Sequence, residues 1–303
     1  MAAVMAVVAV LQLIGALALC SLPISALAHV AEADASRFTD WSFEPWVVFL
    51  MGLSLLLYSA GVLRLAGKSR RVMRQAICFG LGWLTLAAAL LSPIDTLGNA
   101  LFSAHMVQHE LMMIVAAPLL VLSRPFGVWL WALPLQWRPV LGQAVRLPVL
   151  RVPWRFLSLP LTAWLVHALA LWLWHVPAWF DVALADNAIH TLQHLSFLLT
   201  ALFFWWALLD EQAQAAGNGV AMLYLFTTMI HTGALGALMT FSAAPWYVGY
   251  HERSLLFGLS PLEDQQLGGL IMWIPGGLVY LIAGLALGAR WIGLGQIEAG
   301  RRS

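Results

Sequence analysis

Seven long apolar stretches, joined by short polar connections, constrain the fold of this chain more than any other feature. They lie at residues 46–65, 75–92, 101–122, 159–174, 188–209, 220–241 and 267–291. A helix needs about 20 mostly apolar residues to cross a bilayer. Only 10% of the residues are charged, against about 25% in soluble proteins. We therefore expect an all-α, polytopic membrane helix bundle with seven transmembrane helices, and residues 46–291 form one domain because no linker divides them.

The first 28 residues form a further apolar segment before this bundle. It ends in Ala26-Leu27-Ala28, the small-x-small pattern that signal peptidases recognise. The segment has no basic residue before its apolar core, so an additional transmembrane helix is the alternative to a signal peptide. Cleavage would leave residues 29–45 as an extracytoplasmic N-terminal segment.

The basic residues predict the orientation of the bundle. Five follow the first apolar stretch, five follow the third, and three lie near the C-terminus, out of fifteen in the whole chain. Loops rich in Lys and Arg remain on the cytoplasmic side of a membrane. We therefore expect the N-terminus outside and a cytoplasmic tail at residues 292–303. No basic cluster of the kind that binds nucleic acid is present.

Two of the apolar stretches begin with nearly the same segment, His105-Met-Val-Gln-His109 and His190-Thr-Leu-Gln-His194. Residues four apart share one face of a helix, so each segment can direct two imidazoles toward one point. A single pair of this kind is more often a packing feature than a metal site. Two pairs with the same His-x-x-Gln-His pattern inside membrane spans favour a metal site with four nitrogen ligands.

Three other histidines lie in the same half of the predicted bundle. With a rise of 1.5 Å per residue, His167 and His231 lie roughly 10–15 Å from the outer ends of their stretches. His175 follows the fourth stretch at its outer end. Ionisable groups inside membrane spans are by default functional, so we expect these three to be further ligands or a transfer path.

The available ligand types favour copper. Imidazole suits copper, zinc, iron and nickel, and thioether sulfur favours Cu(I) in particular. Met239 and Met272 are therefore conceivable ligands, although methionine in a membrane protein is usually a packing residue. Glu110 follows the first histidine pair and is either a charge partner for a cation or a protonated carboxyl bonded to another helix.

Signatures of enzymes are missing from the sequence. A zinc protease places Glu directly after the first histidine of a pair, whereas Glu110 follows the second. The sequence also has no Gly-x-Ser-x-Gly nucleophile elbow, phosphate-binding loop or dinucleotide fingerprint. We therefore expect a protein that is not an enzyme.

Further motifs accompany the two histidine pairs. They are Ala117-Pro118-Leu-Leu, Trp174-His175-x-Pro177, Phe180-Asp181, Trp205-Trp206, Met229-Ile-His231-Thr232, Trp246-Tyr247 and Asp264-Gln265-Gln266-Leu-Gly268-Gly269. In this combination, from about residue 45 to 290, the chain resembles the CtaG family of bacterial cytochrome c oxidase assembly factors associated with caa-type oxidases. Members often have two prolines where this chain has Ala117-Pro118, a difference that concerns helix shape more than ligands.

The resemblance implies a protein of the bacterial cytoplasmic (inner) membrane that handles copper while a haem–copper oxidase is built. The four paired histidines would be the primary ligands, and the cytochrome c oxidase core subunit would receive the metal. An extracytoplasmic copper chaperone is a conceivable donor. Asp181, Asp186 and Asp264 would collect the cation on the outer side.

Three other functions are compatible with the sequence. In a b-type membrane cytochrome, one histidine from each of two helices would hold haem b from both faces, although a spacing of four residues cannot hold two haems. A transporter would use the buried histidines and Glu110 to relay protons or admit copper. An interaction scaffold with structural histidines would leave their concentration in one half of the bundle unexplained.

The leader generates a testable prediction. If Ala26-Leu27-Ala28 is cleaved, the protein purified from membranes begins at His29. Mass spectrometry of the intact protein measures this directly. A chain that retains Met1, or lacks only Met1, would contradict the prediction and favour the additional helix.

Overall fold

The computed structural model describes residues 38–65, 70–209 and 218–302, and this part of the chain is helical without a strand. The leader therefore lies outside the described residues. Six helices are long and apolar enough to cross a membrane. They are α3 (Pro45–Leu65), α4 (Arg70–Leu91), α13 (Asn187–Leu209), α14 (Asn218–Thr240), α15 (Pro261–Arg302) and the continuous series α6 (Phe102–Glu110), η2 (Leu111–Ala116) and α7 (Ala117–Ser123). The predicted all-α membrane bundle is confirmed.

The fourth predicted span differs from the others. It is α11 (Pro160–Trp174), whose 15 residues rise about 22 Å, less than the roughly 30 Å of a bilayer core. α10 (Pro148–Leu157) precedes it, and the two helices are bent by 77°. The number of spans is therefore six, or seven if this bent pair counts as one.

The last helix is longer than the sequence predicts. α15 begins at Pro261 rather than residue 267 and continues to Arg302. The residues expected to form a separate tail after 291 therefore continue the helix.

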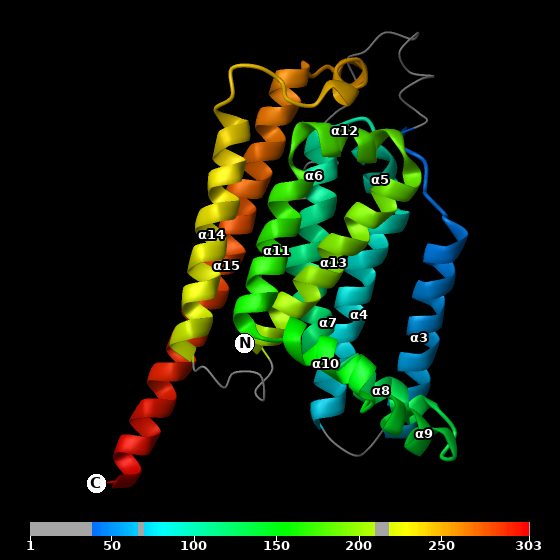
Figure 1. The fold of residues 1–303 in the computed structure, drawn as a ribbon, viewed down its shortest axis with the longest axis vertical. Coiled ribbons are helices and arrows are strands. Elements are labelled where there is room, and N and C mark those ends of the chain that lie inside the picture. Colours follow the sequence, from blue (N-terminus) through cyan, green and yellow to red (C-terminus); the bar gives the residue numbers. More distant parts are fainter. Residues whose placement is uncertain (1–37, 66–69, 210–217, 303) are drawn as a thin grey trace.

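The two ends of the bundle carry different connections (Figure 1). One end has α5 (Pro93–Gly98), α12 (Pro177–Ala185), η4 (Val248–Tyr250) and η5 (Ser254–Phe257). The other has α8 (Pro125–Ala132), α9 (Trp137–Ala144) and α10. Arg64 at the end of α3 donates to the carbonyl oxygens of Trp131, Ala132 and Leu133 near the end of α8. The Arg-rich connections thus gather at the end that carries α8 to α10.

The series α6–η2–α7 forms the core of the bundle, because 78% of its membrane window is buried. Its middle turn is a π-helix, in which the Ala117 N–H bonds to the Met112 carbonyl five residues earlier. Pro118 has no N–H to donate to the carbonyl four residues before it. The Trp205 indole of α13 donates to the Met113 carbonyl at 2.8 Å and so satisfies one carbonyl of this irregular turn.

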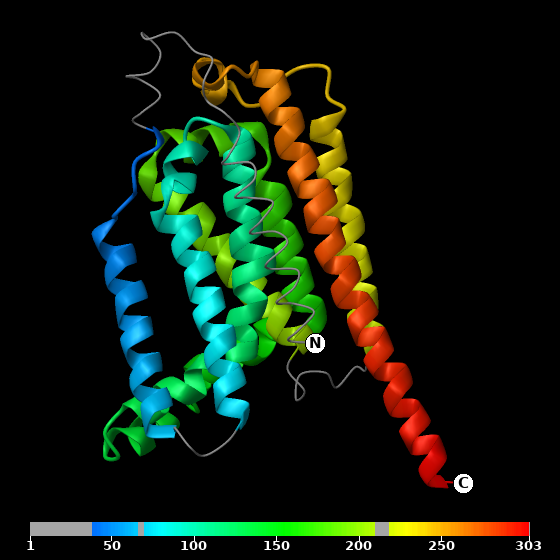
Figure 2. The same ribbon diagram turned by 180° about the vertical axis from the view of Figure 1, so that it is seen from behind.

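α14 and α15 pack side by side along their length (Figures 1 and 2). A methyl group on Gly236 would lie 2.7 Å from the Gly269 carbonyl oxygen, and one on Gly269 would lie 2.6 Å from that of Gly236. Small residues allow the backbones of two membrane helices to approach this closely.

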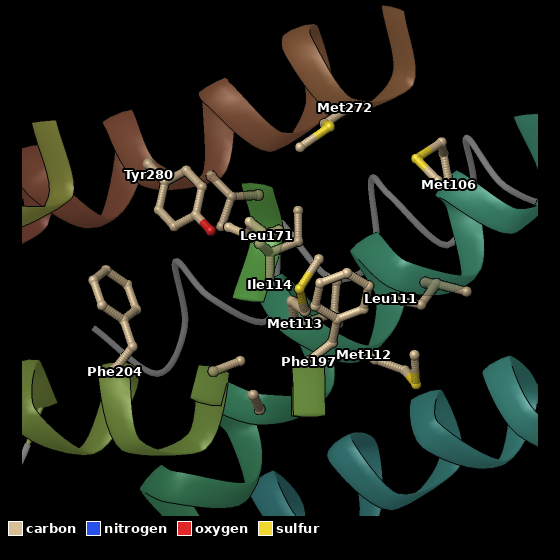
Figure 3. Packing of buried hydrophobic residues seen from close by; sticks show 14 of the residues in the cluster. Met106, Leu111, Met112, Met113, Ile114, Leu171, Phe197, Phe204, Met272 and Tyr280 are labelled. Carbon is tan, nitrogen blue, oxygen red and sulfur yellow. The ribbon is translucent and has the colours of Figure 1, made fainter. Parts of the chain in front are cut away.

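α15 also packs against α6. A methyl group on Gly268 would meet the Phe102 ring at 2.4 Å. Met106 of α6 and Met272 of α15 belong to the hydrophobic core that fills the bundle at this level (Figure 3). α15 therefore covers the α6 face that carries Phe102 and Met106.

The grouping of basic connections predicts the orientation of the bundle. We expect the end with α8 to α10 in the cytoplasm, because positive loops are retained there. Reporter fusions after residues 68 and 146 should be active only for a cytoplasmic reporter, and a fusion in the 251–253 turn only for a periplasmic one. The opposite pattern would invert the predicted topology.

Candidate metal centre

α6 and α13 bring the two histidine pairs together as the sequence predicts. The ligand atoms of His105, His109 and His194 all lie within 4.8 Å of one another. The His190 ring centroid lies 4.1 Å from that of His194 and 5.2 Å from that of His105. We call these four residues the His tetrad.

The His tetrad is buried, with exposed fractions of 1% for His105 and His109, 8% for His190 and 9% for His194. The Nε2 atom of each has no hydrogen-bond partner, and neither has Nδ1 of His109. Buried polar atoms without a partner are rare and costly. Neutral imidazole nitrogen is also the commonest metal ligand. The burial and the free nitrogens together fit a site for a metal ion.

A backbone carbonyl orients one ring of the tetrad. The Gly98 carbonyl oxygen lies 3.4 Å from Nδ1 of His105 and also accepts a hydrogen bond from the Tyr250 hydroxyl at 2.8 Å. A carbonyl can only accept, so this contact places the proton on Nδ1 and the lone pair of His105 on Nε2. Bonds of this kind commonly orient metal-binding histidines.

The glutamine inside each histidine motif lies beside the tetrad. Gln108 donates to the Ala89 carbonyl at 2.9 Å and to the Asp95 carboxylate at 2.7 Å, which fixes α6 against α4 and α5. Gln193 is buried next to His105. Burial raises the pKa of Asp95, and hydrogen bonds from Ser42 and Gln108 partly oppose this rise. The Gln repeated in the two His-x-x-Gln-His motifs is the sequence signal that marks these positions.

Aromatic rings cover the tetrad on the side of α12. The Phe180 ring lies 5.0 Å from His105 and 4.4 Å from Tyr247, and the Phe102 ring lies 4.6 Å from Tyr247. All three residues are buried. This aromatic cover separates His105 from the connections at that end of the bundle.

A cavity of about 290 Å³ reaches the tetrad from a different side, between α3, α4 and α13. His190 and His194 lie at its wall, and the wall also includes polar groups at the beginning of α3, in α5 and at the beginning of α13: Ser42, Glu44, Asp95, Thr96, Asn99 and Asn187. We call this space the outer cavity. Glu44 and Asp95 are thus the acidic residues at its wall, and neither was among the acidic residues predicted to collect a cation.

The acidic residues predicted to collect a cation make other contacts. Asp264 accepts from the backbone N–H groups of Phe102 at 2.6 Å and Ser103 at 3.0 Å, and so caps α6. Asp186 caps α13 through the N–H groups of residues 188 and 189. Asp181 accepts from the Gly249 N–H at 3.3 Å. None of the three lines the outer cavity.

Of the remaining predicted histidines, His175 lies beside the tetrad, whereas His167 and His231 have contacts elsewhere. The rings of Phe180 and Phe197 contact His175 at 6.2 and 6.1 Å, and each also contacts a tetrad imidazole. His167 bonds through Nδ1 to Thr200 at 3.0 Å. His231 on α14 accepts from the Trp172 indole at 3.4 Å. The Nε2 atoms of these three histidines also have no partner.

The other predicted ligand candidates face away from the tetrad. A methyl group on Gly276 of α15 would lie 2.9 Å from Oε2 of Glu110. Met272 lies one turn from Gly276 on the same face of α15. Met239 accepts a hydrogen bond at its sulfur from the Tyr247 hydroxyl at 3.6 Å. The structure therefore does not bring Glu110, Met239 or Met272 to the four imidazoles.

This arrangement can hold one cation. Metal–nitrogen distances near 2.0–2.1 Å place the nitrogens of a tetrahedral site about 3.3–3.4 Å apart. The ligand atoms of His105, His109 and His194, which lie up to 4.8 Å apart, require a small inward rotation of these rings around an ion. The fold and the site define a multi-pass helical membrane protein with a buried cluster of nitrogen ligands.

Comparison with known families agrees with this class. The family model described as cytochrome c oxidase caa3 assembly factor (Caa3_CtaG) matches residues 56–293. The chain belongs to this family of cytochrome c oxidase assembly factors. The match includes all four tetrad histidines.

Two relatives in mycobacteria are similar over most of the chain. A protein of Mycobacterium bovis described as uncharacterized is 29% identical over 276 residues, which cover 85% of this chain and 40% of that protein. One from Mycobacterium leprae, also described as uncharacterized, is 28% identical over 276 residues, which cover 84% of this chain and 40% of that protein. The chain thus spans less than half the length of these relatives. No solved structure matches the chain.

The position of Asp264 generates a stability prediction. Asp264→Ala leaves two backbone N–H groups and the Ser103 hydroxyl without a partner in a buried site. Each unsatisfied group costs about 1–3 kcal/mol, so we expect a free energy of unfolding at least about 2 kcal/mol lower. Thermal unfolding in detergent should show this as a lower midpoint.

Asp186→Ala is the matched control, because Asp186 also caps a helix but is exposed. Its loss should cost about 1 kcal/mol. Equal midpoints for Asp264→Ala and the wild type would contradict the capping role of Asp264.

Proposed function

We propose that the protein binds copper through the His tetrad and delivers it to the core subunit of cytochrome c oxidase during assembly. It acts as a multi-pass protein of the bacterial cytoplasmic membrane, and its role is handling a metal ion rather than catalysis. Membership of the assembly factor family supports the link to the oxidase. The copper ion is the species that the protein delivers and not a resident cofactor.

One observation carries the copper assignment. Four imidazoles that share a buried space each have an Nε2 atom without a partner. Water replaces a missing ligand poorly inside a membrane protein, so free nitrogen lone pairs there favour a bound ion. Imidazole ligands suit copper among the first-row metals, and copper stands above zinc in the usual order of affinities.

The geometry disfavours the haem alternative. Ring centroids from α6 and α13 lie 5.1–5.5 Å apart across the tetrad. Phe180 packs directly on His105 and Phe197 on His109. A haem would need a flat slot for its macrocycle between two axial histidines, and these aromatic contacts fill the space beside the rings.

The surroundings of the site also disfavour a transporter. A second cavity of about 300 Å³ continues toward α8 and α10 and shares Leu50, Met51 and Leu86 with the outer cavity. Its wall is mostly aromatic and aliphatic, with Phe79, Trp83, Trp129, Trp154 and Trp206. A cation would lose its polar contacts there, so this arrangement supports handling of the metal from one end of the bundle.

Removal of a tetrad histidine tests the proposal. His109→Ala or His194→Ala takes one nitrogen donor from the site, so copper affinity should fall by more than the 10–100-fold typical of changes around a metal site. The double variant should be little worse than either single one, since ligands that act as a unit are not additive. Copper content of the purified protein and oxidase activity of the membranes are the two measurements.

His251→Ala is the matched control, because His251 lies in the connection between η4 and η5. It should keep both copper and oxidase activity. The absorbance spectrum of the wild type should show no Soret band. A stoichiometric haem spectrum, or unchanged copper and activity in the double variant at equal abundance, would contradict the proposal.

A further inference from the structure

The outer cavity joins the His tetrad to the surface at the beginning of α3. Glu44 is exposed at this position, and His190 and His194 lie at the inner wall. These two histidines are more than nine-tenths buried, and their Nε2 atoms have no partner. The cavity therefore connects exposed carboxylate oxygen with buried nitrogen ligands.

Two carboxylates face the same cavity. Glu44 and Asp95 both line the cavity, and the burial that raises the pKa of Asp95 is reinforced by the negative charge of Glu44. The Asn187 side chain at the beginning of α13 donates to Glu44 at 3.3 Å, and both residues line the cavity. A cation between Glu44 and Asp95 would relieve their repulsion.

Two other sides of the tetrad are apolar. Phe102, Phe180 and Tyr247 cover it toward α12. Toward α8 and α10 the space is lined by tryptophan, phenylalanine and leucine side chains. The outer cavity, by contrast, is a polar route from the surface to the imidazoles.

We propose that a divalent cation reaches the His tetrad through the outer cavity and is first held there by Glu44, Asp95 and His190. Carboxylate oxygen binds a cation that still carries water, and the deeper site then exchanges that water for imidazole nitrogen. His190 lies at the wall of the cavity and also in the tetrad, so it can keep contact with the ion during this exchange. The inference rests on the proposed copper site and extends it by a loading step.

The rate of copper loading tests this route. The full-length metal-free protein in detergent is mixed with Cu²⁺ as the sulfate salt, and retained copper is measured after gel filtration at timed intervals. A focused negative field raises the association rate of a cation by tenfold or more. The double variant Glu44→Gln/Asp95→Asn should therefore load about tenfold more slowly at low ionic strength and reach the same final copper content.

The substitutions preserve the shape of the cavity and the acceptor for Gln108, because an amide replaces each carboxylate. The matched control is Glu252→Gln/Glu263→Gln, which removes two charges at the same end of the bundle outside the outer cavity. It should load at the wild-type rate. Glu44→Gln alone changes an exposed side chain and should slow loading about threefold without affecting folding.

The outcomes separate the two proposals. A wild type that retains no copper overturns the copper site and the route together. Copper retained equally fast by the wild type, the control and the double variant overturns the route and leaves the copper site intact. A lower final copper content in the double variant would place the carboxylates in the resident site and would also overturn the loading step.

Discussion

The rest of the site depends on the buried Nε2 atoms of the His tetrad, which have no hydrogen-bond partner. Water is scarce there, so the Nε2 atoms of the His tetrad need a partner that the described protein atoms do not supply. The surrounding structure keeps the rings in place. Asp264 caps α6, and Gln108 bonds α6 to α4 and α5. The α6 imidazoles are thus positioned by polar contacts made one turn or less away from them.

Two faces of α6 make different contacts: one packs against α15, and the other carries two histidines of the tetrad. One face carries Phe102, Met106 and Glu110 and packs on the glycines of α15. The neighbouring face carries His105 and His109, directed at α13. Small residues on α15 let it pack closely without reaching the imidazoles. The π-helix follows immediately after Glu110, and π-helical turns are frequent at functional sites.

The sequence was sufficient for most of the long apolar helices and for the convergence of the histidines, because both depend on periodicity. A spacing of four places two imidazoles on one helical face, and two such faces at the same depth meet. The roles of the acidic residues were not predictable in this way. Asp264 bonds to groups about 160 residues away, and Glu44 reaches the cavity because the segment just before α3 lies beside the beginning of α13. Contacts of this kind are properties of the packing and leave no local pattern.

The two cavities differ in polarity, and this difference bears on how an assembly factor would release a metal ion. A cation in the His tetrad has polar atoms toward the outer cavity and apolar rings toward α8 and α10. In the proposed role, the ion would leave through the polar outer cavity, and histidines of the receiving oxidase subunit would replace the nitrogens of the tetrad. His190 and His194, at the wall of the outer cavity, are the ligands that such a partner would meet first.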